Sequence, residues 1–139
     1  MAESLVGDIT PVDGVPKPEK SRREAETMDY ICDTLLGKWN GGMNGKEIRE
    51  IWQEYEDSRT LEAVFVHDVD KMELILQMVE YERVNEGKVE LGEFTWVAGR
   101  IVLPEMKQWA KEVMQERLKM WQAWGKEPRW ENDTKPKEE

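Results

Sequence analysis

The sequence contains one cysteine and one histidine among its 139 residues. The single cysteine, Cys32, excludes a framework of intramolecular disulfides and is typical of a reducing compartment. Because no histidine or cationic residue lies close to Cys32 along the chain, we expect it to be a small buried side chain rather than a reactive thiol.

Long apolar runs are also missing. No stretch approaches the roughly 18–20 consecutive apolar residues that a membrane-spanning helix requires. The first residues have neither the basic start nor the apolar core of a signal peptide. We therefore expect an intracellular protein, cytoplasmic and compatible with the nucleus, that has no membrane partner.

Positive charge is in the minority, since 20 Lys and Arg residues stand against 30 Asp and Glu, for a formal net charge of -10. Binding to a nucleic-acid backbone requires a basic surface, so we expect no nucleic-acid polymer as a partner. A small anionic substrate remains compatible with this charge, because a bound metal ion can outweigh it locally. The length suits one domain with a modest core.

Helical patterns fill most of the chain, and no segment shows the period-2 alternation of a strand, so the predicted fold class is all-α. Residues 1–6 could form the last turn of a helix. Further helices are expected at about residues 18–36, 46–57, 60–82, 93–99 and 104–125. The last of these has an apolar stripe that consists of Met106, Trp109, Ala110, Val113, Met114, Met120, Trp121 and Trp124.

Residues 126–139 form a charged segment that contains two prolines. This composition predicts a disordered tail. Trp130 is the one residue in it that could anchor the segment to the rest of the chain.

Asp70 lies inside the apolar helical pattern of residues 61–82. At helical spacing it shares a face with Ala63, Val66 and Leu74, so we expect its carboxylate to point toward a core. A buried ionised carboxylate requires a cation, hydrogen bonds or a metal. Spacing alone favours an ion pair with a Lys or Arg of another helix over a role as metal ligand.

Two other sets of residues could carry chemistry. The dipeptide His67–Asp68 offers adjacent nitrogen and oxygen ligands, but both residues flank Lys71 at helical spacing, which favours a solvated charge cluster. Glu3 and Asp8 straddle a helix end and a glycine turn, where two carboxylates could serve proton transfer or the activation of a metal-bound water. Acidic residues are common at such places, so spacing alone supports this site weakly.

Four blocks of the sequence resemble, in order, the HD-domain 5'-deoxynucleotidase family, and most of all its eukaryotic branch. The blocks are MAESLVGDI at residues 1–9, PEKSRRE at 18–24, IWQEYE at 51–56, and a fourth at 62–82 that contains EAVFV, DKMELILQ and EYE. Together they cover about residues 1–117. The resemblance implies a partial HD domain over residues 1–125, a helical bundle that is truncated at its N-terminus.

The resemblance also implies a function. Members hydrolyse deoxyribonucleoside 5'-monophosphates to deoxynucleoside and phosphate with a divalent cation such as Mn, Co or Mg. By position in the blocks, Asp70 matches the family's late metal-binding aspartate. The resemblance implies that Glu3 is the acidic residue near the metal that helps to activate water or the leaving group, and that Asp8 lines the sugar side of the pocket.

In the family, the other metal ligands are a histidine and a His-Asp pair, and the pair directly precedes the segment that begins here at Met1. Three of the four ligands are therefore expected to be missing, so that the 139-residue chain alone binds no metal and has no activity. We favour a chain whose start was assigned at an internal methionine. The alternatives are a helical interaction or dimerisation module, with Trp109, Trp121 and Trp124 as its surface, or a decayed fragment. The family's tendency to dimerise makes a homodimer a candidate assembly.

Overall fold

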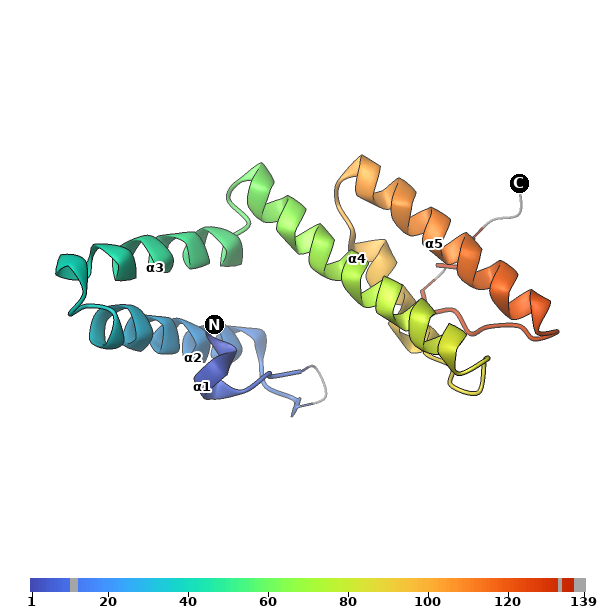
Figure 1. Cartoon of the computed structure of the whole chain (residues 1–139), viewed down its shortest axis with the longest axis horizontal. Coiled ribbons are helices and arrows are strands. Elements are labelled where there is room, and N and C mark those ends of the chain that lie inside the picture. The colour runs from blue at the N-terminus through green and yellow to red at the C-terminus, as the bar shows by residue number, and fades with distance from the viewer. Residues whose placement is uncertain (11–12, 133, 137–139) are drawn as a thin grey trace. The chain divides into compact units, whose positions relative to one another are not determined.

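A computed structural model describes residues 1–10, 13–132 and 134–136 (Figure 1). These residues contain helices and no strand, so the all-α prediction is confirmed. The elements are α1 (Glu3–Val6), α2 (Lys17–Asp29), the π-helix η2 (Tyr30–Leu35), the 3-10 helix η3 (Asn40–Gly42), α3 (Met43–Glu56), α4 (Leu61–Val84), the 3-10 helix η4 (Gly92–Arg100) and α5 (Pro104–Ala123). None of the helices in the described part of the chain is long and apolar enough to span a membrane.

The chain divides into two compact units, Met1–Asp57 and Ser58–Glu139. The sequence suggested one domain over residues 1–125. Each unit has its own small core and is described by itself.

The first unit is a helical hairpin with a short N-terminal helix. α2 begins with a proline in its first turn, which suits the free N–H groups there, and continues directly into η2. α3 then returns alongside η2 (Figure 1). Three buried residues form the core, and two half-buried residues of α3 pack against them: Ala2, Met28 and Cys32, with Ile48 and Trp52. Cys32 is thus buried as predicted, and burial raises the pKa of its thiol.

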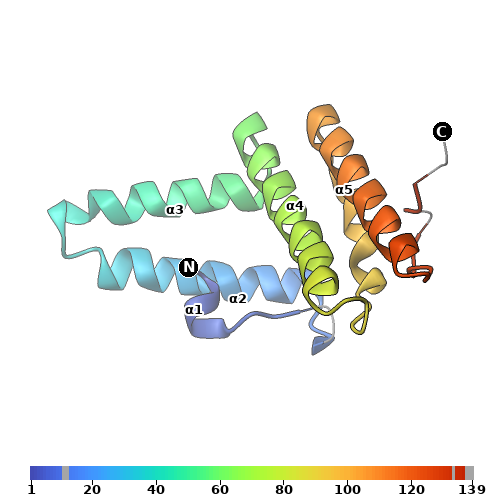
Figure 2. The ribbon, with the colours of Figure 1, turned by 45° about the vertical axis from the view of Figure 1, so that its right-hand side comes forward.

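The second unit is built on two long helices, α4 and α5, that run in the same direction. Figure 2 shows both helices descending side by side, with η4 returning the chain from the end of α4 to the start of α5. Their facing surfaces form the main core, which consists of Met72, Ile75, Met78, Val79, Val97, Ile101, Met106, Ala110 and Met114. Thr60 caps α4, since its side chain accepts a hydrogen bond from the Ala63 N–H at 3.2 Å.

The stripe predicted on the last helix is correct only in part. Met106, Ala110, Met114 and Trp121 are buried, but Trp109 is 56 % exposed. Trp124 is half-buried and makes an edge-on contact with Trp121, at 5.6 Å between ring centroids. The three tryptophans therefore do not form one continuous exposed surface.

The predicted disordered tail is wrong for residues 126–132. Trp130 packs against the core of the second unit, as an anchor would. The Glu131 N–H donates to the Thr95 hydroxyl at 2.8 Å, and the Lys126 ammonium donates to the Gly87 carbonyl at 2.9 Å. Composition predicts disorder because few of these residues are apolar, but a few directed hydrogen bonds hold the segment in place.

Candidate functional site

Asp70 lies on the exposed side of α4, which corrects the prediction that it faces a core. The buried side of the helix carries Asp68, Met72, Ile75 and Val79 at helical spacing. Side chains two positions apart on a helix point in directions that differ by about 200° around its axis. Asp70 is two positions from both Asp68 and Met72, so it points away from the buried side. Its carboxylate therefore has access to solvent in this chain and needs no buried partner.

Asp68, and not Asp70, is the buried aspartate of α4, with 0 % of the residue exposed. Its carboxylate accepts hydrogen bonds from the Val102 N–H at 3.0 Å and from the Leu103 N–H at 2.7 Å. Leu103 is the N-cap of α5, so the carboxylate binds free N–H groups at the positive end of that helix. The predicted solvated cluster at His67–Asp68 is therefore wrong for Asp68.

Opposing effects set the pKa of the Asp68 carboxyl. Burial raises this pKa, whereas the hydrogen bonds from Leu103 and Val102 and the nearby Lys71 ammonium, 3.2 Å away, lower it. The lowering effects together are larger, so the pKa lies below its ordinary value. Asp68 is thus an ionised structural group that joins the start of α5 to α4.

Glu3 and Asp8 belong to the first unit, and both are exposed. α1 ends at Gly7, whose φ of 78° reverses the chain between the two carboxylates. The helix end and glycine turn expected from the sequence are thus present. That these carboxylates act in one site with Asp70 stays a prediction.

A metal site requires several ligands that converge on one point. The described residues contain no group of three or more His, Cys, Asp or Glu side chains arranged to hold a metal ion. Asp70 alone does not form such a site. The residues that the structure describes therefore do not fit a complete metal centre by themselves.

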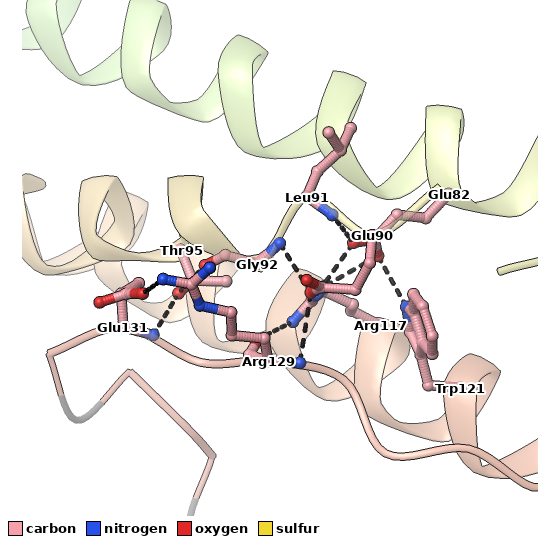
Figure 3. Close-up of polar contacts among 9 residues, drawn as sticks. All are labelled: Glu82, Glu90, Leu91, Gly92, Thr95, Arg117, Trp121, Arg129 and Glu131. Carbon is pink, nitrogen blue, oxygen red and sulfur yellow. Dashed lines mark hydrogen bonds and ion pairs between the residues drawn. The ribbon is translucent and has the colours of Figure 1, made fainter. Parts of the chain in front are cut away.

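A buried polar cluster of the second unit lies where α4 and α5 end (Figure 3). Arg117 and Glu82 are both 0 % exposed and form a bidentate ion pair. The Arg117 Nε and Nη2 atoms each donate to one Glu82 carboxylate oxygen at 2.8 Å. The other donors to the Glu82 carboxylate are the Trp121 indole N–H at 2.7 Å and the Leu91 N–H at 2.8 Å. Its charge is therefore paired and its oxygens are well supplied with donors, as a buried carboxylate requires.

The same arginine holds the C-terminal segment. Arg117 donates to the Arg129 carbonyl at 2.8 Å and to the Glu90 carboxylate at 2.9 Å (Figure 3). Its guanidinium also lies 4.8 Å from the centre of the Trp130 ring. A Cβ on Gly92 would lie 2.3 Å from the Arg129 carbonyl oxygen, so only glycine lets the segment approach this closely.

This cluster was not predicted from the sequence, although the sequence contains a signal for it. Glu82 continues the buried series Ile75 and Val79 on α4, and Arg117 continues the buried series Ala110 and Met114 on α5. Opposite charges at apolar positions of two helices are a pattern expected of a buried ion pair. The cluster has a structural role, since it joins α4, α5 and the residues around Glu90.

The comparison with known families gives a decisive match. The profile described as HD domain covers residues 1–110. This chain belongs to the HD domain family. HD domains generally bind divalent metal ions, which agrees in general terms with the expected cofactor.

Several curated proteins are similar to this HD chain. The 5'-deoxynucleotidase hdd1 of Schizosaccharomyces pombe is 47 % identical over 121 residues, which are 87 % of this chain and 61 % of that protein. The 5'-deoxynucleotidase YBR242W of Saccharomyces cerevisiae is 43 % identical over 119 residues, 86 % of this chain and 50 % of that protein. The human 5'-deoxynucleotidase HDDC2 is 42 % identical over 118 residues, 84 % of this chain and 55 % of that protein.

These relatives confirm the resemblance to the eukaryotic 5'-deoxynucleotidases. The HD chain spans between half and about three fifths of the length of the relatives described above. The match to the family ends before the C-terminal segment that Arg117 holds.

Proposed function

We propose that this chain is part of a metal-dependent HD phosphohydrolase that converts deoxyribonucleoside 5'-monophosphates to deoxynucleoside and phosphate inside the cell. The relatives carry the proposal, because all three described above are 5'-deoxynucleotidases. The net charge of -10 does not oppose an anionic substrate, provided that a cation binds beside it.

Asp70 is the residue that we assign as a metal ligand. It shares its side of α4 with Val66, Leu74 and Tyr81, which are 49 %, 36 % and 58 % exposed. An exposed apolar stripe of this kind is typical of a surface that another element covers. In the proposed enzyme, the covering element carries the histidine and the His-Asp pair, which lie outside these 139 residues.

Glu3 and Asp8 have separate roles in this proposal. Glu3 exchanges a proton with the attacking water or with the leaving oxygen, as a general acid or base. Asp8 contacts the sugar of the substrate. Both side chains are exposed, so a ligand can reach them.

A fusion protein tests the function. The part of the Schizosaccharomyces pombe relative that precedes its matched region is joined to Met1, and phosphate release from deoxynucleoside monophosphates is measured with Mn or Co. We expect turnover by the fusion and none by the 139-residue chain alone. Asp70→Asn should reduce turnover by at least about 10-fold, because losing a ligand costs no less than losing a group that orients one.

The matched control is Glu80→Gln, which changes another exposed carboxylate of the same helix and should leave turnover unchanged. A folded fusion without phosphatase activity would instead support a non-catalytic interaction module. Measuring the molar mass of the fusion in solution tests the expected homodimer.

A further inference from the structure

Two Asn-Gly pairs lie four residues apart in the first unit, at Asn40–Gly41 and Asn44–Gly45. In such a pair, the backbone nitrogen of glycine can attack the side-chain amide of the preceding asparagine. Glycine favours this attack because it has no Cβ to hinder it or to restrict its rotation. The two pairs share the Asn-Gly dipeptide but have different structural surroundings.

The first pair lies in open surroundings. Asn40 and Gly41 are both exposed, and a Cβ built on Gly41 would meet no atom within 4 Å. Asn40 has a φ of 48°, in the left-handed region that asparagine adopts more readily than other residues with a Cβ. It lies in the three-residue turn η3, so rotation for the attack disturbs the hydrogen bonds of one short turn and not those of a long helix. The Asn40 side-chain amide donates to the Asn44 side-chain oxygen at 3.2 Å, in an exposed contact.

The second pair is held by packing. Asn44 and Gly45 belong to the first turn of α3, and Gly45 is buried. A Cβ on Gly45 would lie 2.2 Å from the backbone carbonyl oxygen of Cys32. The attack requires Asn44 to leave its helical ψ, and this rotation would pull Gly45 away from Cys32.

We propose that Asn40 is a site of spontaneous deamidation and that the fold protects Asn44. The Gly41 nitrogen gives its proton to hydroxide and bonds to Cγ of Asn40. The bond from Cγ to the side-chain nitrogen breaks, and ammonia leaves. Water then opens the resulting five-membered imide, giving aspartate if it attacks Cγ and isoaspartate if it attacks the backbone carbonyl. One water is consumed for each ammonia released, and no oxidant or reductant is involved.

The new carboxylate lies two residues before Gly42, the N-cap of α3. A negative charge near the N-terminus of a helix is favourable. The product can no longer donate to Asn44, but that contact is on the surface. The aspartate product is therefore expected to keep α3 and to differ mainly in charge, whereas the isoaspartate product also lengthens the backbone by one carbon ahead of the helix.

Peptide mapping of the full chain tests the proposal directly. The folded protein is incubated at mildly alkaline pH and digested with trypsin, which cleaves after Lys38 and Lys46 and releases both pairs in one peptide. Each deamidation adds about 1 Da, and fragment ions assign it to one asparagine. We expect Asn40 to react at least about tenfold faster than Asn44, which corresponds to about 1.4 kcal/mol of local opening at α3.

Two variants and one condition serve as controls. Asn40→Gln should remove the acidic species that accumulates on ion exchange, whereas Asn44→Gln should leave it. In denaturing urea the two asparagines should react at similar rates, because the fold no longer protects one of them. Equal rates in the folded chain, a persistent difference in urea, or an unchanged acidic species in Asn40→Gln would each overturn the proposal.

Discussion

Replacing Arg117 with methionine removes the buried cation of the second unit and keeps a side chain of similar length. Glu82 then loses two charged hydrogen bonds of 2.8 Å and keeps only the neutral donors of Trp121 and Leu91. The Arg129 carbonyl loses its donor as well. Breaking one side of a buried ion pair typically costs about 3–5 kcal/mol, because the remaining charge is left uncompensated.

This loss is large compared with the total stability of a small domain, which is about 5–15 kcal/mol. With a urea dependence of about 1–3 kcal/mol per molar, the unfolding midpoint should fall by about 1–5 M. The assay is urea unfolding followed by tryptophan fluorescence. Trp121 reports on this cluster, because its indole N–H donates to the Glu82 carboxylate.

The matched control is Arg83→Met. Arg83 also forms two ion pairs, with Glu80 and Glu116, but all three side chains are largely exposed. Exposed pairs contribute about 0–1 kcal/mol, so this variant should unfold close to the parent midpoint. If Arg117→Met is no less stable than Arg83→Met, the assignment of Arg117 as the centre of the buried cluster is wrong.

Two further predictions concern the contacts at either end of α5. The pKa of Asp68 is lower in the folded chain than in the unfolded chain, where it is about 4. The ionised Asp68 carboxylate therefore stabilises the fold fully above about pH 4, and this stabilisation is lost as the pH falls from there through the folded pKa. The stability difference between the parent and Asp68→Asn, measured by urea unfolding, should therefore shrink below about pH 4, and a difference that grows there would contradict the assignment. Gly92→Ala should cost about 1–3 kcal/mol and speed tryptic cleavage after Arg129, because its Cβ would meet the Arg129 carbonyl at 2.3 Å. Gly99→Ala is its control, since a Cβ there would meet nothing within 4 Å, and equal cleavage of both variants would rule out the clash.

The sequence predicts the helices of this chain well and the orientation of α4 poorly. Apolar residues occur all around that helix, with Val66 and Leu74 on the exposed side and Ile75 and Val79 on the buried side. Periodicity identifies such a segment as a helix but cannot choose which face is buried. The prediction that Asp70 faces a core failed for this reason.

Contacts between distant residues were the other features that the sequence did not reveal. Glu82 and Arg117 are 35 positions apart, and their pairing depends on α4 and α5 running in the same direction. The order of residues 126–132 depends in turn on the Arg129 carbonyl reaching Arg117. Amino-acid composition contains no information about either contact, because each joins residues far apart in the sequence. The family resemblance was recognisable from the sequence because it rests on short local blocks.

The metal content of the fusion protein shows directly whether Asp70 is a metal ligand. The fusion, its Asp70→Asn variant and its Glu80→Gln variant are purified with excess Mn, dialysed, and analysed for bound metal by mass spectrometry. We expect one equivalent of metal in the fusion and in Glu80→Gln, and a loss of most of this metal in Asp70→Asn with the helical content unchanged. Full metal occupancy in a folded Asp70→Asn fusion would contradict the assignment of Asp70 as a ligand.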